Sequence, residues 1–125
     1  MKKTVVATNA PAALGPYSHG QIAGNLVFTS GQLPIDTATG AFPEGIQAQT
    51  KQSLINVQAV LEAAGAKMSD IVKTTVFIKN MNDFGAMNEV YGTFFAADFP
   101  ARTCVEVARL PKDALVEIEA IAYVK

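Results

Sequence analysis

Residues 100–119 read Pro100-Ala-Arg-Thr-Cys-Val-Glu-Val-Ala-Arg-Leu-Pro-Lys-Asp-Ala-Leu-Val-Glu-Ile-Glu119. The first half alternates polar and apolar residues, as a strand does. One face of that strand is predicted to carry Arg102, Cys104, Glu106 and Ala108. A second alternating run, 116–124, places Glu117 and Glu119 on one face of another strand. A cation, a thiol and a carboxylate in one short segment are the components of a polar pocket, although such residues also occur on ordinary sheet edges.

Whether Arg102 and Glu117 can share a ligand depends on how the two strands pair. In a direct hairpin around residues 110–114, they would lie about six residues apart along the ladder, or roughly 20 Å. A joint site therefore requires another strand between them, a different register, or residues from a second subunit. The residues themselves favour none of these three.

Two helices are predicted from the spacing of apolar residues. In residues 46–64, apolar residues recur at intervals of three and four, at Leu54, Val57, Leu61 and Ala64. Gly65 is predicted to cap the C-terminus of this helix. Residues 84–97 carry a similar stripe, formed by Phe84, Met87, Tyr91, Phe94 and Phe95.

Further strands are predicted at 4–8, 17–23, 25–30 and 71–79. Gly24-Asn25 is a tight-turn dipeptide between the second and third of them, and 71–79 is rich in β-branched residues, which is typical of a central strand. Prolines and glycines make 9–16 and 31–45 irregular connections. The resulting order, β-β-β-α-β-α-β-β, favours a single α+β domain over residues 1–125, with both helices against one face of one sheet.

Composition narrows the function classes. The 125 residues are 50% hydrophobic and 17% charged, with a formal net charge of -1 and no basic block, so no nucleic-acid footprint is visible. A mean hydropathy of +0.22 suggests apolar surface hidden between subunits. A single cysteine, no signal peptide and no apolar run of about 20 residues are typical of a soluble, cytoplasmic protein.

Other kinds of site are less well supported. One histidine and one cysteine cannot form a metal-ligand cluster. Ser18 and His19 are neighbours whose side chains point to opposite faces of a strand, so they cannot act as nucleophile and base, and His19 is expected to be a structural or surface residue. Cys104 is expected to line a pocket rather than to attack substrate. On spacing alone, Arg102 and Glu117 do not establish a function.

The segment from Pro100 to Pro111, followed by Val-Glu-Ile-Glu, resembles the signature of the Rid (YjgF) family of enamine/imine deaminases. The resemblance is closest to the RidA subgroup and covers nearly the whole chain. Further matching segments fall in the expected order, namely Gly15-Pro-Tyr-Ser18, Thr29-Ser-Gly-Gln32, Gln52-Ser-Leu-Ile-Asn56, Lys73-Thr-Thr-Val-Phe77 and Asn82-Asp-Phe84.

This resemblance implies a chorismate-mutase-like α+β fold, with a mixed six-stranded sheet and two helices on one face. In that fold the strand after the first helix lies between the last two strands. It also implies a homotrimer whose active sites lie at subunit interfaces. The substrates would be reactive 2-imino or enamine acids such as 2-aminoacrylate, hydrolysed to 2-keto acids and ammonia without a cofactor or metal, a form of metabolite damage control.

The same resemblance assigns roles to individual residues. Arg102 would bind the substrate carboxylate, Glu117 would activate water, and Cys104 would shape the pocket. The substrate would also contact Tyr17, Ser30, Gly31 and Asn88. The chemistry is suitable, because an arginine fork binds a planar carboxylate and an imine carbon is already electrophilic.

Two other function classes stay open. One is a metabolite-binding regulatory trimer without turnover. The other is an RNA-acting translation inhibitor, which the slightly acidic charge balance disfavours. A chaperone-like role through exposed apolar surface also stays open.

Overall fold

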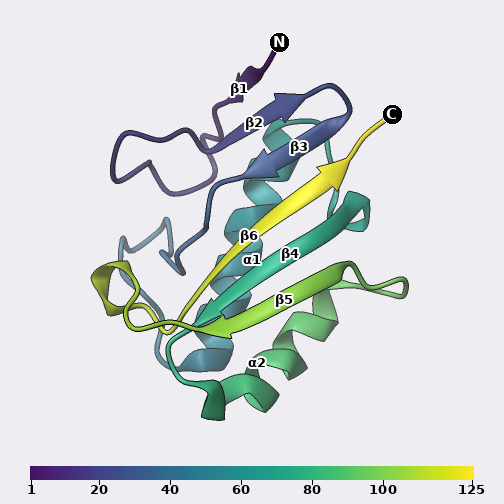
Figure 1. Ribbon diagram of the computed structural model, residues 1–125. Helices are drawn as coiled ribbons and strands as arrows, with labels where there is room; N and C mark the ends of the chain where they lie inside the picture. Colours follow the sequence, from purple (N-terminus) through teal and green to yellow (C-terminus); the bar gives the residue numbers. More distant parts are fainter.

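Six strands form one sheet in the order β1-β2-β3-β6-β4-β5 in the computed structural model, which describes residues 1–125 (Figure 1). The strands are β1 (Lys3–Val5), β2 (Gly20–Ala23), β3 (Leu26–Thr29), β4 (Ile71–Ile78), β5 (Ala101–Glu106) and β6 (Val116–Tyr123). Strands β4 and β5 are parallel, and all other neighbours are antiparallel, so the sheet is mixed. Strand β4 lies between β5 and β6, as the family resemblance implied, and the last two strands do not form a hairpin.

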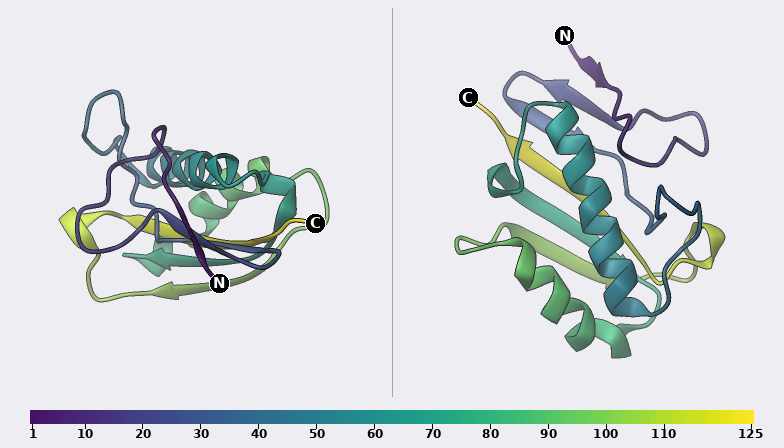
Figure 2. Two further views of the ribbon diagram at one scale, coloured as in Figure 1. Left: turned by 90° about the horizontal axis from the view of Figure 1, so that it is seen from above. Right: turned by 180° about the vertical axis from the view of Figure 1, so that it is seen from behind.

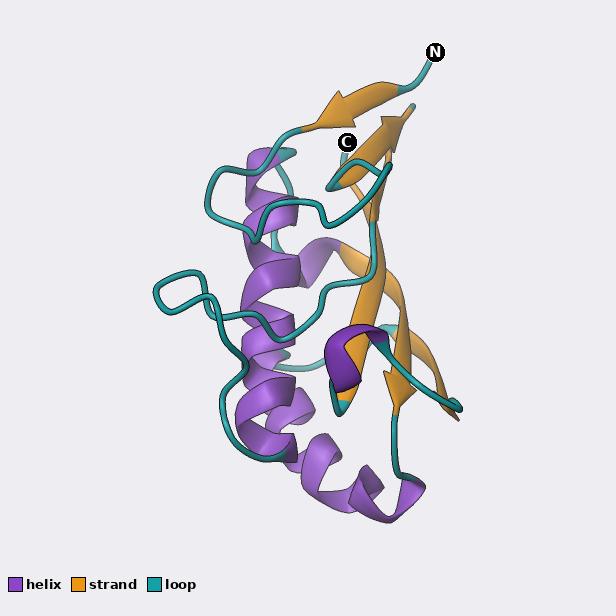
Figure 3. Ribbon diagram, turned by 90° about the vertical axis from the view of Figure 1, so that its left-hand side faces the viewer, coloured by secondary structure: helices purple, strands orange, loops and turns teal.

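Two helices, α1 (Ile46–Ala63) and α2 (Phe84–Tyr91), cover one face of this sheet (Figures 2 and 3). Short 3₁₀ turns connect the elements at Met68–Asp70, Met81–Asp83, Gly92–Phe94 and Pro111–Asp113. The expected α+β architecture with both helices on one side is therefore confirmed. Neither helix has the length and apolarity that a membrane crossing requires.

The end of α1 follows the predicted glycine cap. Gly65 adopts a φ of +81°, its N–H donates to the Glu62 carbonyl at 3.1 Å, and the Ala66 N–H donates to the Leu61 carbonyl at 2.8 Å. This pair of bonds is the Schellman arrangement, which satisfies carbonyls that the last helical turn leaves unpaired. Gly65 has no Cβ and therefore tolerates the left-handed conformation.

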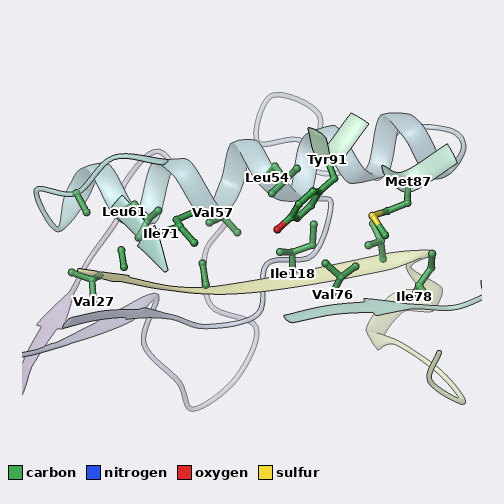
Figure 4. Packing of buried hydrophobic residues seen from close by; sticks show 14 residues of the cluster. Val27, Leu54, Val57, Leu61, Ile71, Val76, Ile78, Met87, Tyr91 and Ile118 are labelled. Carbon is green, nitrogen blue, oxygen red and sulfur yellow. The ribbon is translucent and has the colours of Figure 1, made fainter. Parts of the chain in front are cut away.

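The main hydrophobic core lies between the helices and the sheet (Figure 4). Its fourteen buried residues include Leu54, Val57 and Leu61 of α1, Met87 and Tyr91 of α2, and Val76, Ile78 and Ile118 of the central strands. Each fully buried aliphatic side chain contributes roughly 1.5–3 kcal/mol through removal from water. The core thus holds α2 against β4, which sets the position of the α2 residues discussed below.

The opposite face of the sheet has no helix over it (Figure 3). Along β6, residues 116, 118, 120 and 122 are buried, and the alternate residues, which begin with Glu117 and Glu119, point to the uncovered side. Exposed apolar side chains lie on the strands of the sheet as well, at Leu26, Phe28, Val105 and Tyr123.

The second helix is shorter than its apolar stripe predicted. It ends at Tyr91 rather than at residue 97, and a single 3₁₀ turn, Gly92–Phe94, follows before Phe95 becomes extended. Gly92 is a poor helix former, because glycine loses the most backbone entropy in a helix. The Thr93 hydroxyl donates to the Val90 carbonyl at 2.6 Å, and this bond competes with the regular backbone hydrogen bonds of the helix.

Several strands are also shorter than predicted. The first covers residues 3–5 rather than 4–8, and β2 begins at Gly20 rather than at residue 17. Strand β5 ends at Glu106, so the expectation that Ala108 shares its face with Arg102 is wrong. The backbone makes one more ladder bond, from the Val107 N–H to the Ile78 carbonyl at 3.0 Å, and then leaves the sheet.

Candidate active site

Arg102 projects from β5 toward α2, on the helix-covered side of the sheet. Its Nη1 donates to Oδ1 of Asn88 at 2.7 Å. Its Cζ lies 4.8 Å from the ring centroid of Tyr91 and 5.4 Å from that of Phe84. Tyr91 is itself fixed by a buried 2.7 Å hydrogen bond between its hydroxyl and Oγ1 of Thr74. The guanidinium is therefore preoriented, and its remaining N–H groups are free to hold a planar acid group.

Cys104 lies two residues along the same face of β5. Burial raises the pKa of its thiol, and the nearby Arg102 charge only partly offsets this, so the sulfur is a neutral thiol at neutral pH. Because the Val107 N–H points toward β4, the alternation of a strand turns the peptide groups of Arg102 and Cys104 to the open edge. Cys104 is thus suited to contribute backbone groups and shape rather than a nucleophile.

Arg102, Asn88 and Tyr91 border a cavity of about 350 Å³ whose other lining residues are Gly92, Phe99 and Pro100. The group formed by Arg102, Cys104, Asn88, Phe84 and Tyr91 is called the Arg102 half-site below.

A second group of predicted residues forms where β3 leaves the ladder with β6. The Oγ1 of Thr29 accepts from the Ala120 N–H at 3.0 Å, where a backbone carbonyl would otherwise stand. Backbone pairing resumes at Gln32, whose N–H donates to the Ile118 carbonyl at 2.7 Å and whose carbonyl accepts from the Ile118 N–H at 3.2 Å. Residues 30–31 are consequently pushed out of the ladder.

Gly31 lies directly against the side chain of Glu117. A Cβ at this position would lie 2.9 Å from both Cδ and Oε2 of Glu117, which is closer than such contacts occur in proteins. The absence of a side chain is therefore what lets the carboxyl group rest there. The Gly31 N–H has no acceptor within the chain, and Ser30 donates its hydroxyl to the Ser18 carbonyl at 2.6 Å and keeps its oxygen as an acceptor.

Glu117 is half-buried on the helix-free side of the sheet. Its carboxyl group has no hydrogen-bond or ion-pair partner in the chain. Burial raises the pKa of Glu117, and the negative charge of Glu119, two residues away on the same face, raises it further. A carboxylate with a raised pKa is a stronger base than an ordinary glutamate.

Glu117 borders a hollow of about 620 Å³ that also has Tyr17, Ser30, Gly31, Leu33, Pro111 and Glu119 among its lining residues. The Tyr17 hydroxyl accepts from the Leu14 N–H at 3.0 Å, which positions its half-exposed ring at the rim. Tyr17, Ser30, Gly31 and Glu117 are called the Glu117 half-site below.

One chain does not bring the two half-sites to one ligand. In the sheet register, Arg102 stands beside Thr74 of β4 and Glu117 stands beside Phe77, three residues further along. Thr74 faces the helices and Phe77 faces the other side, so the two functional side chains point in opposite directions. The strand inserted between them shortens their separation, but a common ligand requires a second copy of the chain.

Sequence reasoning did not assign site roles to Glu119, Phe84 or Tyr91. Glu119 carried a signal, because it recurs two residues after Glu117 on the same strand face. The two aromatic residues belong to the apolar stripe of a helix, and nothing local indicates that they flank an arginine from a different strand.

Of the two roles expected for His19, structural or surface, the structure shows the structural one. Its Nδ1 accepts from the Ala7 N–H at 3.1 Å, and its Nε2 lies 2.9 Å from the Pro11 carbonyl, so both ring nitrogens tie the N-terminal loop to β2. No group of three or more histidine, cysteine, aspartate or glutamate side chains is arranged to hold a metal ion.

Known proteins match this chain over a range that includes both half-sites. A family model described as "Endoribonuclease L-PSP" matches residues 7–124. A curated Salmonella typhimurium protein named 2-iminobutanoate/2-iminopropanoate deaminase is 59% identical over 125 residues, which cover 98% of each chain. The solved YjgF gene product of E. coli has a TM-score of 0.95 at 56% identity and covers 98% of this chain and 99% of its own. E. coli TdcF, solved with bound serine, has a TM-score of 0.95 at 50% identity with the same coverage.

Proposed function

Because this chain belongs to the Rid (YjgF) family, which the L-PSP model represents, we propose that it hydrolyses 2-imino and enamine acids to 2-keto acids and ammonia. The observation that carries this proposal is the pair of half-sites: a preoriented arginine at one edge of the sheet, and a carboxylate of raised pKa in a hollow on the other face. The deaminase name of a 59% identical relative supports the reaction, and the serine bound by TdcF supports a small ligand with a carboxylate.

Arg102 binds the substrate carboxylate. The bond to Asn88 and the two flanking rings fix the plane of the guanidinium, so a carboxylate can accept two parallel N–H bonds without reordering the side chain. The outward-facing peptide groups of β5 at Cys104 and the unpaired Gly31 N–H supply further contacts to the substrate.

Glu117 activates the water that attacks the imine carbon. An enamine acid such as 2-aminoacrylate first tautomerises to the imine. As the water oxygen bonds to C2, Glu117 takes one of its protons and the C=N electron pair moves to nitrogen. Glu117 then passes that proton to the nitrogen, which gives the carbinolamine and returns Glu117 to its carboxylate form. The resulting carbinolamine collapses as its hydroxyl proton passes through Glu117 to the amine, the C–N bond breaks, and ammonia leaves the 2-keto acid. General-base assistance of this kind contributes about 10²- to 10⁴-fold.

The complete site forms between protomers. The Arg102 half-site is at the β5 edge and the Glu117 half-site is on the helix-free face, so the surfaces that meet are different. Contacts between different surfaces are heterologous, and they close into a ring when the rotation permits. We take three copies from the family resemblance. The exposed Leu26, Phe28, Val105 and Tyr123 supply apolar surface for such an assembly.

A mixing experiment tests the shared site. 2-Aminoacrylate is generated from serine by a dehydratase, and keto-acid formation is followed with Arg102→Ala, with Glu117→Gln, and with the two variants unfolded and refolded together. Each variant alone should be nearly inactive. In statistically mixed assemblies about a quarter of the junctions combine an intact Arg102 with an intact Glu117, so about a quarter of the activity should return.

If the mixture stays as inactive as its components, while refolded parent protein regains activity, the shared site is wrong. If the parent protein does not accelerate keto-acid formation but binds a keto acid, the chain is a metabolite-binding module instead. The family description also names an endoribonuclease, but two adjacent carboxylates in the hollow repel phosphate. Salt-sensitive RNA binding would favour that alternative.

A further inference from the structure

Three amide side chains lie on one face of α1, at Gln49, Gln52 and Asn56, and the proposed reaction gives them no part. Gln49 and Asn56 are buried, at 7% and 1% exposure, in a helix whose other buried positions are mostly aliphatic. Buried amides need partners for their donors and acceptors, so the groups that they bind show what they hold in place.

Asn56 holds the segment that follows Gly31. Its Nδ2 donates to the carbonyls of Leu33 at 2.9 Å and of Ile35 at 3.0 Å, and its Oδ1 accepts from Gln52 at 3.0 Å. Both amide protons are therefore used on one irregular stretch of backbone that has no strand partner of its own. Leu33 lines the hollow next to Glu117.

Gln49 holds the other end of the same connection and the start of β6. Its Nε2 donates to the Pro43 carbonyl at 3.1 Å, and its Oε1 accepts from the Leu115 N–H at 2.9 Å. Leu115 precedes Glu117 by two residues. The helix thus binds both the wall of the hollow and the strand that carries the carboxylate.

We propose that Asn56 and Gln49 are positioning residues for the hydrolytic step, because together they set the spacing between the 31–35 wall and Glu117. The inference rests on the proposed function. Between these two tethers, the Gln32–Ile118 pairing fixes the near end of the wall, and Gly31 touches the Glu117 carboxyl group. A wall that moves outward would admit water around Glu117 and would displace the Gly31 N–H.

This role predicts a separation of kinetic effects. The Arg102 half-site lies at the β5 edge and is oriented by α2, and neither amide hydrogen-bonds to a residue of that half-site. Substrate binding through the carboxylate should therefore survive loss of the amides, while the attack of water should slow. Displacement of a reactive group by about 1 Å can reduce the rate of a chemical step about 100-fold.

The test compares three substitutions on one helix: Asn56→Leu, Gln49→Leu and Gln58→Leu. Gln58 is the matched control, because its side chain hydrogen-bonds to Glu62 of the same helix and to neither the wall of the hollow nor β6. Rates of keto-acid formation are measured at a temperature at which each variant is folded by circular dichroism. Asn56→Leu and Gln49→Leu should lower kcat about 10- to 100-fold with KM within about threefold, and Gln58→Leu should stay within about twofold of the parent protein.

Full kcat in folded Asn56→Leu and Gln49→Leu overturns the inference, as does a parallel rise in KM that accounts for the whole loss. If Asn56→Leu does not fold, Gln49→Leu decides, because it leaves the Leu33 and Ile35 bonds intact.

Titration of the Glu117 carboxyl by carbon-13 NMR separates this inference from the proposed function. Tyr17 from the N-terminal loop and Glu119 from β6 are the other titratable groups that one chain places in the hollow, and the proposed assembly adds Arg102 of a neighbouring copy; all three are unchanged in these variants. A looser wall should hydrate Glu117 and lower its pKa in Asn56→Leu but not in Gln58→Leu. If the parent protein shows no turnover, the proposed function fails, and an unchanged pKa in Asn56→Leu would then overturn the positioning role as well.

Discussion

The two half-sites are built in different ways. Arg102 is held by side chains, namely one amide oxygen and two aromatic rings, and its guanidinium is preoriented before any ligand arrives. Glu117 is held only through its backbone, between β4 and the segment at Gln32, and its carboxyl group has no partner. The first arrangement is typical of a binding group, which gains from a fixed geometry. The second is typical of a reactive group, whose pKa is adjusted by burial and a like charge.

This contrast predicts which kinetic parameter a substitution in each half-site should change. Changes at Glu117 should act mainly on the chemical step, and changes at Arg102 mainly on the capture of substrate. Four predictions test that division, and they are ordered below by the size of the expected effect.

Glu117→Gln should lower kcat about 10²- to 10⁴-fold with little change in KM, because the amide cannot accept the proton of water. The same change should not destabilise the protein at pH 7. Because the pKa of Glu117 is raised in the folded state, its carboxyl group stabilises the folded protein at a pH below the ordinary pKa of glutamate. That stabilisation is lost as the pH rises through the raised pKa, so it is absent from the comparison at pH 7. Steady-state kinetics and thermal unfolding at pH 4 and pH 7 measure both effects, and a Gln variant with parental kcat would exclude the base.

Arg102→Ala should lower kcat/KM by an amount equivalent to about 2–5 kcal/mol, because the substrate carboxylate loses its paired charge. Arg102→Lys should recover little, since an ammonium group cannot form two parallel bonds in one plane. Asn88→Ala keeps the charge and removes only its anchor, so its KM should rise by much less. Equal kinetics for Arg102→Lys and the parent protein would contradict the role of the fork.

Gly31→Ala should reduce kcat about tenfold, because the new methyl group displaces the Glu117 carboxyl that now lies 2.9 Å from its position. Stability should change little, since the group that must move is the end of a flexible side chain. Gly85→Ala is the matched control, as an added Cβ there meets no atom within 4 Å. Equal kcat values for the two alanine variants would show that Gly31 does not constrain Glu117.

Glu119→Gln should have the smallest effect at neutral pH. Burial, the main cause of the raised Glu117 pKa, remains, but the repulsion from Glu119 is removed, so the pKa of Glu117 falls. Activity that requires ionised Glu117 is lost on the acid side, and the acidic limb of the kcat/KM profile should therefore move to lower pH. A limb that stays in place, or moves to higher pH, would show that the two carboxylates are not coupled.

Much of this architecture was predictable because its signals are local. The 3.6-residue spacing of Leu54, Val57 and Leu61 indicated α1, and Gly24-Asn25 indicated the turn between β2 and β3. The end of α2 was not predictable from its stripe. The apolar residues continue to Phe95, but Gly92 and Thr93 end the regular helix before it.

The pairing of the strands was harder to predict from the sequence than the strands and helices themselves. The sequence allows three spatial relations between Arg102 and Glu117, because alternation within a strand does not specify which strand lies beside it. The same limit applied to α1: Gln52 and Asn56 belonged to a matching segment, yet the sequence did not indicate that Asn56 binds the backbone at Leu33.

By itself, the sequence determined the α+β class, the order of the elements and the family, since these depend on patterns among residues that are close along the chain. It also identified Arg102 and Glu117 as the residues to examine. Only the tertiary structure decided that they face opposite sides of the sheet, that Asn88 and two rings orient the arginine, and that Gly31 touches the carboxylate. Those relations depend on strand order and on contacts between residues far apart in sequence, which arise only when the whole sheet has formed.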